Sequence, residues 1–211
     1  MGLEREHKWL VKIFPDVAGL EKAFAAAAVE MHYTAERSQH DTYFDTPERQ
    51  LQSAGAALRV RRFGTETLAT YKGPGTVVDT LHTREEIEVP FVKPPAVEPL
   101  AVDTWPEAIG AKLVSLGVAA ARLEPVLDIH TARTRYLLYG SDTSTPLAEL
   151  SFDEVRVGYR ERRVQFRELE LEAQTDTTDA TLAQLGAVLT SFDLKPHDSD
   201  KLTHALSLLG L

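Results

Sequence analysis

Charged residues recur at every second position in several segments of the chain. Glu4, Glu6 and Lys8 have this spacing near the amino terminus, and Arg59 and Arg61 repeat it within an apolar segment. Side chains two residues apart point to the same face of a β-strand. Further members of the pattern are Lys72, Arg84, Glu86, Glu88, Arg133, Arg135, Glu149, Asp153, Glu168, Glu170 and Glu172. The spacing therefore predicts one sheet face on which several strands gather cations and carboxylates.

These residue types suit a particular chemistry. Clustered lysines and arginines bind phosphate groups, and carboxylates together with phosphate oxygens hold Mg²⁺. A bound polyanion with a metal would explain why both kinds of group share a face. Phosphoryl transfer requires mainly positioning and charge stabilisation, so no covalent nucleophile is needed. For any single strand, an open solvated sheet with cross-strand ion pairs is the more common arrangement, but the repetition over many strands favours a ligand site.

The composition excludes several classes of protein. The 211 residues include 23 basic and 32 acidic side chains, and the formal net charge is −9. Such a chain is a poor candidate for binding duplex nucleic acid or an anionic membrane. The absence of cysteine excludes a disulfide framework and a thiolate zinc site. Because the start is charged and no apolar run approaches the ~20 residues of a membrane helix, we expect a cytoplasmic protein.

The pattern of apolar residues predicts a strand-rich α+β fold. Strands are expected at 3–13, 39–44, 57–63, 67–72, 81–89, 126–138, 147–157 and 162–173, and helices at 16–29, 46–55, 106–116, 178–192 and 199–209. The segment 90–104 is expected to be a long connection, 140–146 a hairpin loop and 73–75 a turn. Few strands are separated by a full helix, which favours an antiparallel sheet or barrel whose apolar outer face is covered by helices. No linker or repeat divides the chain, so residues 1–211 are expected to form a single domain.

Short motifs along the chain match one known family in order. Residues 4–8 fit a Glu-x-Glu-x-Lys signature, and the segments that follow it are Tyr43-Phe44-Asp45-Thr46-Pro47, Leu58-Arg59-Val60-Arg61, Thr70-Tyr71-Lys72-Gly73-Pro74, Arg84-Glu85-Glu86-Ile87-Glu88, Thr131-Ala132-Arg133 and Glu168-Leu169-Glu170. Each motif alone is weak, but the ordered set is specific and spans residues 3 to about 204. In these motifs the chain resembles the CYTH, or triphosphate tunnel metalloenzyme, superfamily.

The resemblance implies an eight-stranded antiparallel β-barrel, open as a tunnel, that binds triphosphates with Mg²⁺ or Mn²⁺. Members of the superfamily include inorganic triphosphatases, thiamine triphosphatases, class IV adenylyl cyclases and RNA triphosphatases. We therefore expect a small triphosphate as the partner of this chain, which is expected to be a monomer or a homodimer.

The resemblance also implies roles for individual residues, carried over by position. The phosphate-binding residues would be Lys8, Arg59, Arg61, Lys72 and Arg133, and Lys201 matches a late lysine of the family on the C-terminal helix. Arg84 and Arg135 are further expected substrate contacts because of their strand phase, and the alternative for Arg135 is an ion pair with neighbouring carboxylates. The metal ligands would be Glu4, Glu6 and Glu170 for a first ion, and Asp153, Glu168 and one of Glu86 or Glu88 for a second ion or the attacking water. Glu149 shares a strand face with Asp153, so either could face the metal. Glu172 is a further candidate metal ligand, and the alternative for it is a place at the tunnel rim. Lys8, Asp153 and Glu168 are thus the expected catalytic residues. The chain departs from the family pattern at Asp200, where serine usually precedes the late lysine.

The leading functional hypothesis is a divalent-metal-dependent hydrolase that releases the terminal phosphate of a small triphosphate. Inorganic triphosphate is the first substrate expected, followed by nucleoside or thiamine triphosphate. One alternative is a class IV adenylyl cyclase, which would need an adenine pocket that the sequence does not identify. Another is a non-enzymatic polyphosphate-binding module, which would not need the carboxylates that this chain carries.

Overall fold

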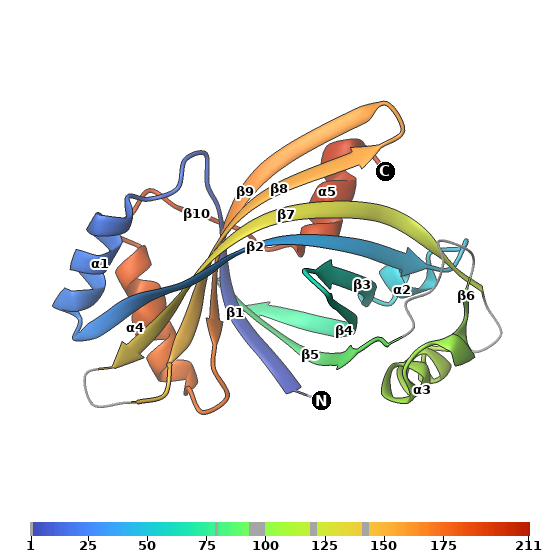
Figure 1. Ribbon diagram of the computed structural model, residues 1–211, viewed down its shortest axis with the longest axis horizontal. Helices are drawn as coiled ribbons and strands as arrows, with labels where there is room; N and C mark the ends of the chain where they lie inside the picture. Colours follow the sequence, from blue (N-terminus) through green and yellow to red (C-terminus); the bar gives the residue numbers. More distant parts are fainter. Residues whose placement is uncertain (1, 79, 93–99, 119–121, 141–143) are drawn as a thin grey trace.

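Eight antiparallel strands close into a barrel in the computed structural model, which describes residues 2–78, 80–92, 100–118, 122–140 and 144–211. The order around the barrel is β1-β5-β4-β3-β2-β7-β8-β9, and β9 pairs back with β1 (Figure 1). The barrel strands are β1 (Gly2–Leu10), β2 (Val29–Asp45), β3 (Ala57–Phe63), β4 (Glu66–Val78), β5 (Leu81–Pro90), β7 (Arg122–Gly140), β8 (Ala148–Tyr159) and β9 (Arg162–Ala173). The predicted α+β barrel is confirmed.

Two further short strands extend this sheet at its margins. They are β6 (Leu100–Ala101), which pairs with β7, and β10 (Lys195–Pro196), which pairs with the end of β1. The helices are α1 (Val17–Ala26), α2 (Gln50–Ser53), the 3₁₀ helix η1 (Val102–Thr104), α3 (Glu107–Ser115), α4 (Asp179–Leu189) and α5 (Lys201–Leu209). None of the described helices is long and apolar enough to span a membrane.

The helices cover the barrel in three places, each with its own apolar core. Helices α1 and α4 lie together at one end of the molecule, and α3 lies at the opposite end (Figure 1). Ile109 and Leu113 of α3 pack in a cluster with Leu58 and Val60, and all four side chains are fully buried. Because Leu58 and Val60 alternate with Arg59 along β3, the burial of one face directs the charged residues to the inside.

Helix α5 packs against the third core and closes one end of the barrel interior. Its residues Ala205 and Leu206 belong to a buried cluster with Ile129 and Val155, which share the inward phase of their strands with Arg133 and Asp153. The Asp200 side chain caps the helix by accepting a hydrogen bond from the backbone of Thr203 at 2.8 Å. The first residue of α5 is therefore held at the edge of the barrel interior.

Two strands are longer than the sequence predicts. Strand β2 begins at Val29 rather than at residue 39, because its polar first half pairs with β7 over its length as an exposed ribbon without apolar alternation. Strand β4 continues past Lys72 to Val78, because residues 73–75 form a β-bulge instead of the predicted turn. A Cβ atom on Gly75 would lie 3.0 Å from the backbone oxygen of Thr83, so the close approach of β5 requires glycine there.

The short helix predicted from residue 46 begins four residues later, at Gln50. The carboxylate of Asp45 accepts hydrogen bonds from the backbone of Thr46, Leu51 and Gln52, and therefore caps this turn from outside it. Arg49, just before the helix, has a φ of 60°, which is a left-handed conformation. A right-handed helix therefore cannot run from Thr46 through Arg49, and it begins at Gln50. Thr46 Oγ1 also accepts a hydrogen bond from the backbone of Gln50 at 3.1 Å, so the predicted threonine caps the helix together with Asp45.

Two predicted connections extend beyond what the structure describes. Residues 93–99 of the expected connection at 90–104, and 141–143 of the expected loop at 140–146, lie outside the described residues. The described part of the first connection contains β6 and η1.

Candidate active site

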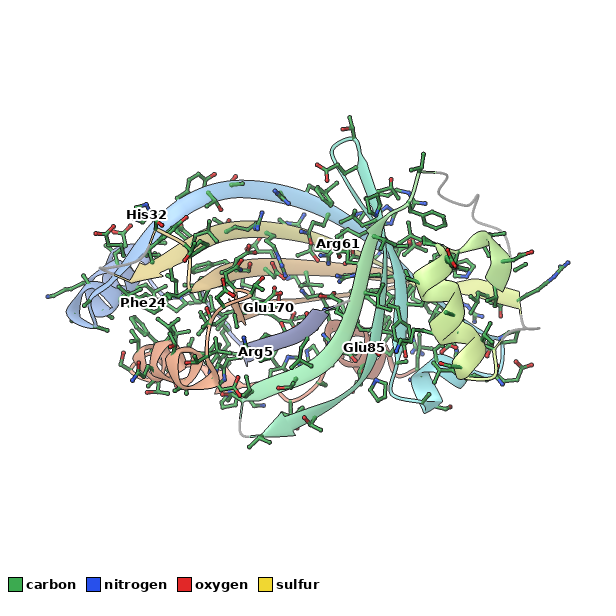
Figure 2. The ribbon with its side chains drawn as sticks, turned by 90° about the horizontal axis from the view of Figure 1, so that it is seen from below. Arg5, Phe24, His32, Arg61, Glu85 and Glu170 are labelled. Atoms are coloured by element: carbon green, nitrogen blue, oxygen red, sulfur yellow. The ribbon has the colours of Figure 1, made fainter. Side chains whose placement is uncertain are left out.

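The interior of the barrel holds a cavity of about 290 Å³ whose wall is almost entirely ionisable. Nine cationic and eight acidic side chains line it, so a chain with a net charge of −9 has a small excess of cations here. The lining groups are Lys8, Arg37, Arg59, Arg61, Lys72, Arg84, Arg133, Arg135, Lys201, Glu4, Glu6, Glu86, Glu88, Glu149, Glu170, Glu172 and Asp200. Two of them, Arg61 on β3 and Glu170 on β9, are labelled in Figure 2.

Strand register explains why these residues meet. Across β1 and β9, Lys8 lies opposite Glu170, and Glu6 lies opposite Glu172. Asp153 on β8 is the partner of both Glu168 on β9 and Arg133 on β7. Directly opposed residues of neighbouring strands point to the same face. Charged groups that are far apart in the sequence are therefore adjacent on the inner wall.

A first acidic cluster consists of Glu4, Glu86 and Glu172, all of which line the cavity. One carboxylate oxygen of each lies within 4.8 Å of the others. Lys72 forms ion pairs with Glu4 and, at 3.3 Å, with Glu86. Glu172 has no ion-pair partner among the described residues, and burial together with the charges of Glu6 and Glu4 raises its pKa to about 8. Glu172 therefore holds its proton at neutral pH, and a cation bound beside it would displace that proton.

Glu4 differs from Glu172 because cations surround it. Arg84 Nε lies 2.5 Å from Glu4 Oε2, and the Lys72 ammonium contacts the other oxygen. Burial by itself raises the pKa of Glu4, but the charges of Lys72, Arg84 and Lys8 outweigh that effect and hold the pKa far below its usual value. Glu4 is therefore ionised at neutral pH and available as an oxygen ligand.

A second acidic cluster consists of Asp153, Glu168 and Glu170, deeper in the wall. Lys201 Nζ lies 2.5, 3.2 and 3.3 Å from one oxygen of each of these residues, in the order given. Arg133 binds Asp153 with both Nε and Nη2, at 2.7 and 2.6 Å, and also contacts Glu170. Asp153 and Glu168 are completely buried and do not line the cavity, whereas Glu170 does. The negative charge of this cluster is thus met directly by protein cations.

Among the buried cavity cations of the described residues, Arg59 and Lys8 have the loosest contacts with carboxylates. The Arg59 guanidinium lies 3.5 to 3.8 Å from Asp41, Glu86 and Glu88, and its buried Nε has no hydrogen-bond partner in the described part of the chain. Lys8 Nζ lies 3.0 Å from Glu6 and 3.7 Å from Glu170. Burial by itself lowers the pKa of both groups, but the nearby carboxylates raise it above the ordinary value. Both side chains are therefore charged and have donors free for a ligand.

Other cations in the wall are tightly paired with carboxylates. Arg61 binds Asp41 with two hydrogen bonds of 2.7 Å, a bidentate geometry that fixes the guanidinium plane. Arg135 makes a similar two-point contact with Glu149, through Nε at 2.8 Å and through Nη2. Glu149 is therefore engaged by an arginine and belongs to neither acidic cluster.

All but two of the predicted site residues line the cavity, the exceptions being Asp153 and Glu168. By distance, the carboxylates fall into two groups. Glu170 lies with Asp153 and Glu168 in the second cluster and is also linked to Glu6 through Lys8, while Glu86 and Glu172 join Glu4 in the first. Asp200 stands where the family usually has serine, and its side chain caps α5. The helix therefore begins at Lys201, which lines the cavity as expected.

Several residues of the site are missing from the sequence prediction. Arg37 and Gln39 line the cavity, and Asp41 is fully buried between Arg61 and Arg59. Gln39 and Asp41 lie within the predicted strand 39–44 and share one face of it, so their spacing of two was the available signal. Extending that strand by two residues would have added Arg37. His197, whose Nδ1 lies 3.2 Å from Glu168, has no such signal because it precedes α5 in an irregular segment.

Residues 3–199 match the family model described as the CYTH domain. The chain belongs to the CYTH domain family. Its barrel, its inward-facing charges and the order of its motifs agree with this assignment. The family match also confirms the resemblance noted in the sequence.

Solved structures share the CYTH fold with this chain. One is HpAC1 from Hippeastrum, described as a candidate adenylyl cyclase with a dominant triphosphatase activity, with a TM-score of 0.61 and 17% identity over 98% of this chain and 96% of that chain. A second is a candidate adenylate cyclase from Bacillus halodurans, with a TM-score of 0.57 and 17% identity over 97% and 98% of the two chains.

A third similar structure is the PH1819 protein from Pyrococcus horikoshii, with a TM-score of 0.56 and 20% identity over 98% of this chain and 99% of that chain. A search of curated proteins finds no match. At these identities the likeness establishes the fold.

Proposed function

We propose that this CYTH protein is a divalent-metal-dependent triphosphatase that removes the terminal phosphate of a small triphosphate inside the barrel. The cavity supports this proposal most strongly. Nine cations and a cluster of carboxylates line its volume of about 290 Å³. Gathering so many cations in a buried place is costly unless they are paired or bind an anion. HpAC1, which has the same fold, is described as having a dominant triphosphatase activity, which agrees with the proposal.

The first acidic cluster fits a hard divalent ion. It offers three carboxylate oxygens within 4.8 Å of one another on the cavity wall, and oxygen is the donor that Mg²⁺ and Mn²⁺ prefer. Glu172, which has no cation partner in the described residues, has a ligand atom to give. A bound Mg²⁺ or Mn²⁺ would neutralise phosphate charge and polarise the terminal phosphoryl group.

The cations of the wall would bind and orient the phosphates. Arg59 and Lys8 have loose contacts and free donors, so they are the residues we assign to direct phosphate binding. Arg61 and Arg133 are held by Asp41 and Asp153, and would present rigid guanidinium groups to the developing charge. In the reaction a water oxygen bonds to the terminal phosphorus, and the bridging P–O bond breaks with its electrons on the departing diphosphate. The proton that the water loses goes to the departing oxygen or to bulk water.

Asp153 and Glu168, expected to be catalytic, would act indirectly. Neither lines the cavity, but both contact Lys201, and Asp153 also binds Arg133. Their proposed role is to fix these two cations at the wall, where Lys201 and Arg133 face the substrate. Lys8 remains the proposed catalytic residue that touches the phosphates.

The test follows phosphorus NMR spectra of the purified protein with tripolyphosphate and with ATP, each with Mg²⁺ and with Mn²⁺. We expect orthophosphate with diphosphate from tripolyphosphate, or with ADP from ATP, and no turnover in EDTA. The relative rates rank the two substrates.

Two other outcomes would contradict the proposal. Diphosphate appearing together with cyclic AMP would identify a cyclase, in which the ribose hydroxyl attacks the α-phosphorus. Metal-dependent line broadening without any turnover would indicate a module that binds polyphosphate. An Arg59→Met variant serves as the matched negative for either reaction, since it removes one wall cation.

A further inference from the structure

The two acidic clusters differ in what occupies their centres. In the second cluster, Lys201 Nζ lies 2.5 to 3.3 Å from one oxygen of each of the three carboxylates. Lys201 donates hydrogen bonds to Asp153 and Glu170, whereas Glu168 lies 3.2 Å away as an ion pair and its two oxygens accept no hydrogen bond in the described part of the chain. In the first cluster, Lys72 contacts Glu4 and Glu86 but makes no ion pair with Glu172 in the described part of the chain.

A divalent ion and the Lys201 ammonium need the same place. Magnesium and calcium ions lie about 2.0 to 2.6 Å from their oxygen ligands, and the oxygens of the second cluster are within 4.8 Å of one another. The Lys201 ammonium already lies 2.5 to 3.3 Å from one oxygen of each carboxylate, in the space that such an ion would need. A metal there would also approach the Arg133 guanidinium, which contacts Asp153 and Glu170. Three like charges would then be crowded into a fully buried space.

Lys201 is fixed by the helix that carries it. It is the first residue of α5, and the Asp200 side chain caps that helix at Thr203. Ala205 and Leu206 anchor the helix in the third apolar core. The cap and the apolar contacts fix the position of α5, and the backbone of Lys201 is fixed with it. The Lys201 ammonium is therefore held at the second cluster by the fold. The Lys201 side chain is 7% exposed.

We propose that Lys201 is a built-in cation that takes the place of a second divalent ion, so that only the first acidic cluster binds metal. The expectation that each chain binds one ion, at the first cluster, rests on the proposed function. The role of Lys201 concerns the second cluster and can be tested separately. The positive charge that a second ion would supply at Asp153, Glu168 and Glu170 is provided by the polypeptide. Replacing the ammonium by a neutral group of similar length should open a new metal site there.

The experiment counts bound Mn²⁺ per chain, from the electron paramagnetic resonance signal of free Mn²⁺, in the absence of any triphosphate. The variants are Lys201→Met, which removes the charge and keeps the side-chain length, and Lys112→Met as the matched control. Lys112 pairs with Glu85 at 2.7 Å and does not line the cavity. We expect one ion in the unaltered protein and in Lys112→Met, and two in Lys201→Met.

The difference between variants separates the inference from the proposed function. If the unaltered protein bound no ion and Lys201→Met bound one, the first cluster would be wrongly assigned while the role of Lys201 would stand. If a folded Lys201→Met bound no more Mn²⁺ than the unaltered protein, the inference would be overturned. Its melting temperature with and without Mn²⁺ gives a second readout, because the new site should make this variant more strongly stabilised by the ion than the unaltered protein.

A second variant keeps the test decisive if Lys201→Met does not fold. Glu168→Gln removes one carboxylate of the second cluster and leaves Lys201 in place. Because the proposal assigns no metal to that cluster, Glu168→Gln should bind as many ions as the unaltered protein. Loss of one bound ion in Glu168→Gln would show that the second cluster holds metal and would overturn the inference.

Discussion

The two faces of strand β3 carry opposite chemistry. Leu58 and Val60 point outward and are completely buried beneath α3, in the first apolar core. Arg59 and Arg61 point inward and line the charged cavity. The residues alternate one by one, so adjacent positions of a single strand belong to a hydrophobic core and to a proposed binding site.

This difference shows how the barrel sustains a charged interior. Buried ion pairs contribute little net stability, because the cost of removing the charges from water offsets much of their attraction. Burial of apolar surface, in contrast, stabilises by roughly 25 cal/mol per Å². The outer face therefore supplies stability, and the inner face is free to hold charges that suit a ligand. Substitutions on the two faces should separate folding from function.

The largest change in activity should come from replacing Arg59. The control is a replacement of Arg62, which lies on the other face of the same strand. Arg62 lies outside the cavity, and its one side-chain hydrogen bond within the described part of the chain is a 3.4 Å contact with Thr42. We expect Arg59→Met to lower kcat/KM for the triphosphate by about 10²- to 10³-fold, as for loss of a preorganised donor. Arg62→Met should leave kcat/KM unchanged. Equal losses in both variants would contradict a role for the inner face.

Leu58→Ala should have the opposite effect. The side chain is completely buried in the first apolar core, and such truncations cost about 2–5 kcal/mol. We expect urea denaturation to show that loss, while activity under native conditions is retained. Loss of activity at unchanged stability would show that the two faces are not separable in this way.

A smaller effect is expected from Glu86→Gln, compared with Glu85→Gln. These neighbours on β5 point to opposite sides, since Glu86 lines the cavity and Glu85 pairs with Lys112 outside it. Glu86→Gln removes one charged ligand of the first cluster, so Mn²⁺ affinity should fall at least about tenfold. Glu85→Gln should bind Mn²⁺ like the unaltered protein. Calorimetric titration gives both values, and a similar affinity for all three proteins would remove Glu86 from the metal site.

The smallest effect concerns the pH dependence of stability. Burial and the charges of Glu6 and Glu4 raise the pKa of Glu172 from 4.5 to about 8. The folded protein thus retains a proton that the unfolded chain has lost, so stability falls as the pH rises from about 4.5 to about 8. Glu172→Gln cannot ionise and should escape this loss.

This pH effect can be measured by melting both proteins in EDTA at pH 5 and pH 8. The melting temperature of the unaltered protein should fall by at least about 2 °C more than that of Glu172→Gln. Parallel changes in the two proteins would show that Glu172 does not resist ionisation in the folded state.

The fold and most of the site residues could be predicted because they depend on local alternation. The run Leu58-Arg59-Val60-Arg61 indicates a strand with one apolar and one charged face, and the structure has that strand. The same alternation predicted the helix-covered exterior. Short-range patterns of this kind survive folding because the period of a strand is two wherever it lies.

The remaining features depend on contacts between distant segments. The first half of β2 is a strand because it pairs with β7, and its own residues are polar and exposed. Residues 73–75 form a bulge because β5 lies against them. The division of the carboxylates between two clusters follows from the register of β9 against both β1 and β8, which local sequence does not encode.

The most direct test of the account is a crystal structure of the protein with Mn²⁺ and a triphosphate analogue whose terminal bridging oxygen is replaced by nitrogen. We expect the phosphates to lie inside the barrel, in contact with Lys8 and Arg59. We also expect an anomalous manganese peak at Glu4, Glu86 and Glu172. Phosphates bound outside the barrel, with the cavity filled by water alone, would contradict the claim that the inner face is the binding site.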